Sequence, residues 1–342
     1  MKKVCLINYT TNNQFFQSHE YVDFLFWENY FKNKSNFILN VFCPENNVKK
    51  KTNYTTFKPS RKNNIISTFF KLLKIPKSDL YIFQSYHELH TLLWLIATKI
   101  PFKNNNIYFV ATNNISAKRM SYKLLKFFYF IFKIYKVKIF IHSSSEKLLL
   151  GSIFSKKNII IKKYHFWAEV LGFSEPMIKK SEVLFYPGPS KIDKPVNYFK
   201  SLSNYSIKNN NKFNDLNHIL FNITSSELSL TNQKYVEKSK LSFKDLAKQL
   251  SSSKYIFLPH NFNFEGKFSG NFIDAIYFEV IIISNTINPV LEYFDDYGKL
   301  GIIINYDDPG WEIKLLDQFN NLNPKEIIAN IKKVKKDHSL KS

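Results

Sequence analysis

The chain has 342 residues, a formal net charge of +22 and two cysteines, Cys5 and Cys43. This length suits two domains of roughly 150 residues each, and two cysteines exclude a disulfide framework, which favours a reducing, cytoplasmic location. Arginine occurs only at Arg61 and Arg119. Because phosphate and base recognition prefers arginine forks, and no nucleic-acid-binding motif is present, nucleic acid is not an expected partner. No apolar run approaches the roughly 20 residues that a membrane-spanning helix needs.

The first half alternates short apolar runs with helical patterns. Strands are expected where β-branched and aromatic residues cluster, and helices where apolar residues recur every three or four positions. The predicted strands are 4–8, 37–43, 80–83, 107–111, 137–141 and 159–161, and the predicted helices are 14–30, 87–99, 116–135 and 144–154. The lysine- and asparagine-rich stretch 45–64 is expected to be a loop. The segment 164–181, with Gly172 and Pro176, is expected to be an interdomain linker.

The second half repeats this alternation. The predicted strands are 183–186, 219–223, 255–258, 280–283 and 302–305, and the predicted helices are 194–202, 243–250, 270–278, 289–294 and 309–319, with one more in the tail 324–342. Strands that alternate with helices predict parallel, doubly wound sheets. We therefore expect an α/β fold with two Rossmann-like domains, 1–165 and 182–320, facing a cleft, followed by a helix and basic tail at 321–342.

The segment 255–285 carries the clearest functional signal. A buried strand ends at Pro259, a polar loop with Gly266 and Gly270 follows, and a helix then leads into the next strand. Such a loop lies at the carboxyl end of its strand and feeds a helix N-terminus, where backbone N–H groups and the helix dipole favour a phosphate. This predicts an anion-binding turn at Ser269 and Gly270.

The same segment resembles the donor-binding signature of GT-B glycosyltransferases of the retaining family-4 (group 1) type. Asp274 and Ala275 stand where that family has the second Glu-Ala of its E-x7-E motif, and Glu265 lies one position before the strict place of the first glutamate. The resemblance implies that Asp274 accepts hydrogen bonds from the donor ribose and that Glu265 contacts the donor sugar. With Lys267, whose charge would meet the diphosphate, Glu265 is assigned a catalytic role. The alternative for Asp274 is a favourable interaction with the helix dipole.

A second motif covers residues 183–194. An apolar strand ends in Pro187-Gly188, which resembles the first strand of the family's C-terminal domain and the Gly-Arg-x5-Lys loop after it. Lys194 lies close to the place of the motif lysine, and Lys191 is expected to supply the charge of the motif arginine as a second diphosphate contact. Gly188 and Gly270 would let the backbone approach the donor. The alternative for Lys194 is a solvated surface lysine.

Polar residues that follow predicted strands of the first half are the expected acceptor contacts. They are Asn12 and Asn13 after the first strand, His87 after 80–83 and Asn113 after 107–111. For His87, a capping or packed histidine is the alternative.

The segment 116–136 interleaves lysines with phenylalanines in a helical pattern. Two interpretations stay open: a helix that lies on an anionic membrane, and a Rossmann helix whose apolar side packs on the sheet.

Together, the resemblance implies transfer of a sugar from a nucleotide-sugar to a glycan or lipid-linked acceptor in surface polysaccharide synthesis. The anomeric configuration would be retained, and no metal or other cofactor would be needed. Two alternatives remain: a catalytically inactive sugar- or nucleotide-binding protein on the GT-B fold, and a different nucleotide-sugar enzyme such as an epimerase.

Overall fold

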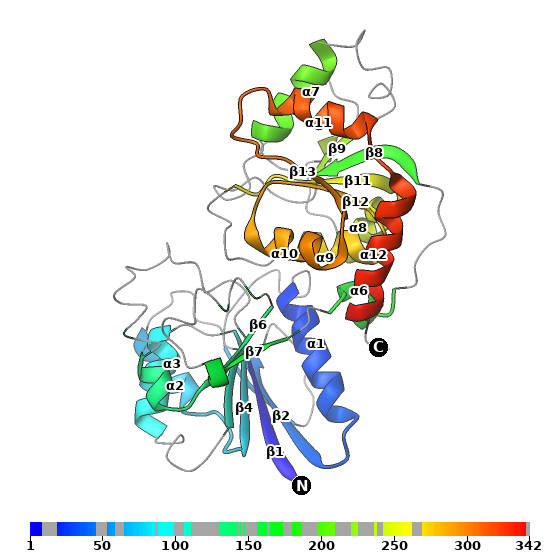
Figure 1. Ribbon diagram of the computed structural model, residues 1–342. Coiled ribbons are helices and arrows are strands. Elements are labelled where there is room, and N and C mark those ends of the chain that lie inside the picture. The colour runs from blue at the N-terminus through cyan, green and yellow to red at the C-terminus, as the bar shows by residue number, and fades with distance from the viewer. Residues whose placement is uncertain are drawn as a thin grey trace. The chain divides into compact units, whose positions relative to one another are not determined.

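The computed structural model describes residues 1–8, 19–45, 53–58, 65–85, 88–98, 106–110, 127, 130–142, 144, 147, 156–162, 165–173, 180–186, 197–208, 220–224, 236–237, 242–261 and 269–339. The chain divides into two compact units, Met1–Lys163 and Tyr164–Ser342. Each unit is built on one parallel sheet with helices packed against it (Figure 1).

The sheet of the first unit has seven strands in the order β3-β2-β1-β4-β5-β6-β7. They are β1 (Lys2–Asn8), β2 (Phe37–Pro44), β3 (Tyr54–Phe57), β4 (Leu80–Ser85), β5 (Asn106–Val110), β6 (Lys138–Ile141) and β7 (Ile159–Ile161). Every pairing is parallel, so all carboxyl ends meet at one edge. The six predicted strands are confirmed. The prediction of a loop throughout 45–64 is wrong, because β3 pairs with β2 and Phe57 packs on Phe42 with ring centroids 5.0 Å apart.

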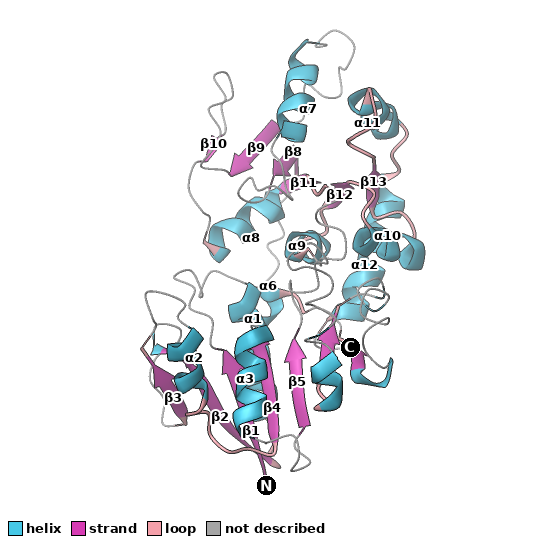
Figure 2. Ribbon diagram, turned by 90° about the vertical axis from the view of Figure 1, so that its left-hand side faces the viewer, coloured by secondary structure: helices cyan, strands magenta, loops and turns pink. Residues whose placement is uncertain are grey.

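Helices cover both faces of this sheet. Helix α1 (His19–Lys32) packs on one face, and α2 (Ile65–Leu72), α3 (Glu88–Thr98) and the helical residues 130–134 pack on the other. Figure 2 shows α2 and α3 side by side in front of the strands. Helix α2 was not predicted from the sequence. A short 3-10 helix, Lys156–Asn158, precedes β7.

The sheet of the second unit has six parallel strands in the order β10-β9-β8-β11-β12-β13. They are β8 (Ser181–Tyr186), β9 (Leu220–Thr224), β10 (Val236–Glu237), β11 (Ser253–Leu258), β12 (Ile281–Ser284) and β13 (Gly301–Ile303). The helices are α6 (Trp167–Val170), α7 (Asn197–Lys208), α8 (Phe243–Ser252), α9 (Gly270–Tyr277), α10 (Asn288–Tyr297), α11 (Trp311–Asn320) and α12 (Pro324–His338). All five predicted strands are confirmed, and β10 is an addition at the sheet edge.

The segment 164–181 is not the free linker expected from its glycine and proline. It contains α6, and Phe166 and Trp167 are each 1% exposed. The Phe166 ring lies 5.2 Å from that of Tyr277 on α9. Two large aromatic side chains remove enough apolar surface from water to fix the segment in the second unit.

Cys5 and Cys43 lie on adjacent strands but on opposite faces of the first sheet, in separate apolar clusters. Both are free and buried. Burial raises the pKa of the Cys43 thiol to about 12, and it raises the pKa of Cys5 as well. Both side chains therefore act as small apolar core residues.

Candidate functional site

The candidate site lies at the carboxyl edge of the second sheet, where the strand order reverses. From β8 the chain continues to β9 and β10 on one side, whereas β11 pairs with β8 on the other. In open α/β sheets, ligands bind outside the carboxyl ends of the strands at such a switch point. The segments that follow β8 and β11 in sequence, to which both predicted donor motifs belong, thus start from neighbouring strands.

Three buried polar residues connect the ends of β11, β12 and α9. His260 Nε2 lies 3.2 Å from the Ser269 hydroxyl, and Asn285 Nδ2 donates to the His260 carbonyl at 2.9 Å. His260 is 0%, Ser269 3% and Asn285 4% exposed. The His260–Ser269 contact joins the end of β11 to the start of α9, and Asn285 attaches His260 to the end of β12.

Ser269 occupies the N-cap position of α9 and, within the described residues, makes no side-chain capping bond to the helix. Its hydroxyl is directed to His260 instead. This hydroxyl therefore leaves the N–H groups in the first turn of α9 uncovered. An anion-binding helix terminus requires uncovered N–H groups.

Asp274 is the fifth residue of α9 and is 1% exposed. The first turn of the helix contains no acidic residue. Because the dipole effect falls off within the first turn, attraction to the helix dipole does not account for the position of this carboxylate. Contact with a ribose stays a prediction.

The predicted site residues divide into two groups. Ser269, Gly270 and Asp274 are described: Ser269 is the N-cap of α9, and Gly270 and Asp274 lie on the helix. The remaining predictions lie outside the described residues: Gly188, Lys191, Lys194, Glu265, Lys267, Asn12, Asn13, His87 and Asn113. His260 and Asn285 were missed, although His260 lies two positions after β11 and Asn285 directly follows β12, and this nearness to a buried strand is the signal that could have identified them.

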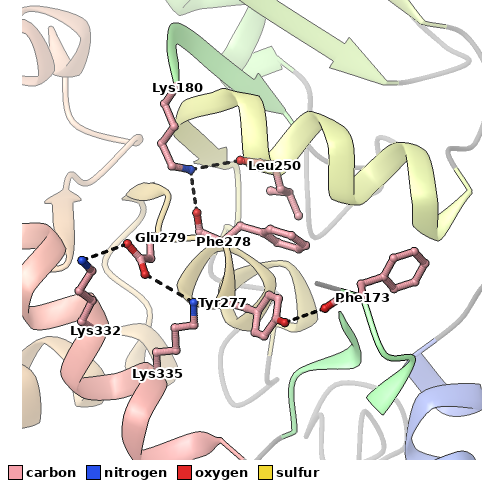
Figure 3. Close-up of polar contacts among 8 residues, drawn as sticks. All are labelled: Phe173, Lys180, Leu250, Tyr277, Phe278, Glu279, Lys332 and Lys335. Carbon is pink, nitrogen blue, oxygen red and sulfur yellow. Dashed lines mark hydrogen bonds and ion pairs between the residues drawn. The ribbon is translucent and has the colours of Figure 1, made fainter. Parts of the chain in front are cut away.

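The far end of α9 is held by a separate polar network at the opposite edge of the sheet (Figure 3). The Lys180 ammonium donates to the carbonyl oxygens of Phe278 at 2.7 Å, Ser253 at 3.2 Å and Leu250 at 3.4 Å. These carbonyls belong to the C-terminal ends of α8 and α9, where a cation is favourable. Lys180 therefore fixes the direction in which α9 presents its N-terminus.

Helix α12 also holds this end of α9. Lys335 and Lys332 on α12 lie 3.5 and 3.6 Å from the Glu279 carboxylate, and the Lys335 ammonium lies 4.8 Å from the Tyr277 ring centroid. The Tyr277 hydroxyl donates to the Phe173 carbonyl at 3.0 Å. The predicted tail helix is thus part of the second unit's packing.

The first sheet has its own switch point between β1 and β4, which pair although β2 and β3 follow β1 in sequence. Asn12 and Asn13 follow β1 in sequence, and His87 follows β4, so these predicted acceptor contacts come after the two strands that form the switch point.

A buried ion pair marks the carboxyl ends of β6 and β7 in the first unit. The Lys162 ammonium lies 3.5 Å from Asp23, and 4.5 and 4.6 Å from the ring centroids of Phe26 and Trp27. Burial lowers the pKa of Lys162, and the Asp23 carboxylate opposes that effect. His142 Nδ1 lies 3.1 Å from the Lys162 carbonyl. These contacts tie α1 to the last strands of the sheet.

In the part of the chain that the structure describes, no group of three or more histidine, cysteine, aspartate or glutamate side chains could hold a metal ion. Across the same residues, no helix is both long and apolar enough to span a bilayer.

Sequence comparison finds no matching family model and no matching curated protein. Solved structures do match in fold. Anabaena HepE in complex with UDP and glucose has a TM-score of 0.60 at 9% identity, with 99% of this chain and 95% of that one covered. A glycosyltransferase from Rickettsia africae ESF-5 gives 0.61 at 12% identity and the same coverage.

A UDP-N-acetylglucosamine 2-epimerase also matches, with a TM-score of 0.56 at 10% identity and coverage of 97% of this chain and 90% of that one. At such low identities the similarity establishes the fold. The chain has two α/β units with parallel sheets in the arrangement of strands and helices known as the GT-B fold.

Proposed function

We propose that this protein is a retaining, metal-independent glycosyltransferase related to family 4. It would move a sugar from a nucleotide-sugar to a glycan or lipid-linked acceptor in surface polysaccharide synthesis, in the cytoplasm. No cofactor would be needed, since the nucleotide-sugar is itself a substrate.

The main observation in support of this proposal is the switch point between β8 and β11. Both donor motifs recognised in the sequence belong to loops that leave these two strands, which pair in the sheet. The N-terminus of α9 opens at the same edge, next to the buried His260–Ser269 contact. Two sequence signals about 70 residues apart are therefore expected to serve one ligand.

The reaction requires positive charge close to the bond between the sugar and the diphosphate, which breaks. As the bond to the sugar weakens, negative charge grows on the leaving diphosphate, and preorganised cations and N–H groups stabilise it. Lys191, Lys194 and Lys267 would supply the cations, and Ser269 and Gly270 the helix terminus. The acceptor hydroxyl would attack from the side of the departing phosphate, which takes its proton.

The remaining residues would orient the two substrates. Asp274 would hold the ribose and Glu265 the transferred sugar, with Gly188 leaving room for the donor. Asn12, Asn13, His87 and Asn113 would bind the acceptor.

Two other functions have an observation in their favour. The similarity to a UDP-N-acetylglucosamine 2-epimerase supports a nucleotide-sugar enzyme of another reaction class. Pro189 at the motif arginine's place and Glu265, one position before the motif glutamate's place, support a binding protein without turnover.

The first experiment is a thermal-shift and calorimetric titration with UDP and a panel of nucleotide-sugars. A ligand at a hundredfold excess over its Kd adds about 2.7 kcal/mol, which corresponds to roughly 5–10 °C for a unit of this size. Asp274→Asn and Lys194→Ala should each reduce the shift. Asp317→Asn is the matched control, because Asp317 is exposed on α11.

Product analysis then separates the three functions. Transfer of the sugar to an added glycan acceptor supports the proposal, epimerised donor supports the second function, and UDP binding without any turnover supports the third. A nucleotide shift that survives both site substitutions would place the nucleotide away from β8, β11 and α9.

A further inference from the structure

A row of apolar side chains faces water on the helices that cover one face of the first sheet. Its members, which we call the apolar ridge, are each between 43% and 60% exposed: Phe70, Leu73, Ile96, Phe127, Phe130 and Ile134. Single exposed apolar residues are ordinary, but a set gathered on neighbouring helices marks an interaction surface.

The ridge residues share one side of one helix layer. In each helix a buried residue lies two positions from a ridge residue: Leu72 from Phe70, Trp94 from Ile96, and Phe132 from both Phe130 and Ile134. Two helical steps turn a side chain by about 200°. Because Leu72, Trp94 and Phe132 all enter the same apolar cluster against the sheet, their ridge partners all point outward from it.

For its described residues, the segment 116–136 fits the interpretation of a helix whose apolar side packs on the sheet. Phe132 packs on the sheet, with its ring 5.1 Å from that of Phe109, as a Rossmann helix requires. Phe127, Phe130 and Ile134 remain exposed on the other side. This helix therefore packs one side on the core and exposes apolar side chains to water on the other side. Helices α2 and α3 continue this exposed apolar stripe.

The helices that carry the ridge have more basic than acidic residues in their described parts. Lys74, Lys133 and Lys136 are exposed beside it. Among the described helical residues 65–72, 88–98 and 130–134, the only carboxylate is Glu88, at the first position of α3. A second copy of this chain would bring like charges together, at a net charge of +22 per chain. An anionic surface with an apolar interior complements both properties.

We propose that the apolar ridge docks this protein on the surface of an anionic lipid bilayer, with the phenylalanines in the headgroup region and the lysines on the lipid phosphates. Side chains of this kind enter the boundary between headgroups and acyl chains without crossing the membrane. The inference rests on the first unit alone and does not depend on the donor site.

The test is flotation of the full chain with neutral phosphatidylcholine vesicles and with vesicles containing 30% phosphatidylglycerol. We expect binding to the anionic vesicles that weakens as salt is raised. Each lysine near an anionic surface contributes about fivefold to partitioning, so Lys74→Glu/Lys133→Glu should lower it by at least about 30-fold. Phe70→Ser/Phe130→Ser/Ile134→Ser should also release the protein.

Matched controls come from the second unit. Ile313→Ser removes an apolar side chain that is 49% exposed on α11, and Lys244→Glu/Lys248→Glu reverses two exposed lysines on α8. Both should bind vesicles like the wild type. Circular dichroism and thermal melts confirm that each variant is folded.

Three results would overturn the proposal: wild-type protein that does not float with anionic vesicles, equal losses in the control variants, or a dimer by light scattering that the ridge substitutions dissociate. The last would assign the ridge to a second copy. Because no nucleotide is present, failure here leaves the donor-site proposal untouched, and failure of the nucleotide titration leaves this one untouched.

Discussion

Replacing Lys180 with methionine removes a charged donor but keeps the length of the side chain. In the native unit the ammonium bonds three carbonyl oxygens at the ends of α8 and α9, the shortest at 2.7 Å. Hydrogen bonds to charged groups contribute about 1.5–3 kcal/mol each. Lys180 is partly exposed, so water can replace part of this network. We therefore expect a loss of about 3 kcal/mol, the value of one to two such bonds.

Differential scanning calorimetry measures this loss. For a unit of the length of Tyr164–Ser342, 1 kcal/mol corresponds to about 2–4 °C, so the Tm of the second unit should fall by roughly 6–12 °C. Lys325→Met, at an exposed position of α12, is the control and should change the Tm by about 1 °C or less. Equal Tm values for the two variants would refute the idea that Lys180 joins the helix ends.

Burial and a hydrogen bond to Asp307 raise the pKa of Tyr198 to about 12, above its ordinary value of 10. The unfolded chain therefore loses this proton first, and the free energy of unfolding falls as the pH rises from 10 to 12. In urea titrations at several pH values, Tyr198→Phe should remove the contribution of about one proton from this pH dependence. At Gly301 an added Cβ would lie 1.8 Å from the Ile282 carbonyl oxygen, so Gly301→Ala should separate β13 from β12 and lower the Tm sharply, whereas an unchanged Tm would contradict this packing. Lys136 has a φ of 51° at the end of its helix, so Lys136→Gly should stabilise the first unit by about 1 kcal/mol in urea unfolding, and a loss of stability would argue against left-handed strain there.

The sheets were predictable because their strands are fully buried. Val4–Ile7, Ile256–Leu258 and Ile281–Ile283 are apolar without interruption, which is what a strand with helices on both faces requires. Strand β3 was missed because its four residues stand in a lysine- and asparagine-rich stretch, and its stability comes from pairing with β2 rather than from local composition.

The misassigned linker has a similar explanation. Gly172 has a φ of 72° and does mark a turn, but Phe166 and Trp167 just before it were the stronger signal. Large aromatic residues in a supposed linker indicate that the segment is packed.

At the site, motif spacing placed Ser269 at the start of a helix and Gly270 and Asp274 on it, and local sequence could go no further. The contact between His260 and Ser269 joins residues nine positions apart, and the pair Lys162 and Asp23 joins residues 139 positions apart. A single polar contact leaves no periodic trace in a sequence. Only the fold brings such partners together.

The placement of the two thiols has a practical consequence. Cys5 and Cys43 both belong to the first unit and are shielded on opposite faces of its sheet. A protonated, enclosed thiol does not attack a labelling reagent. The rate at which the native chain is alkylated therefore reports the opening of that half alone, and a cysteine introduced at any surface position could be labelled selectively against this silent background.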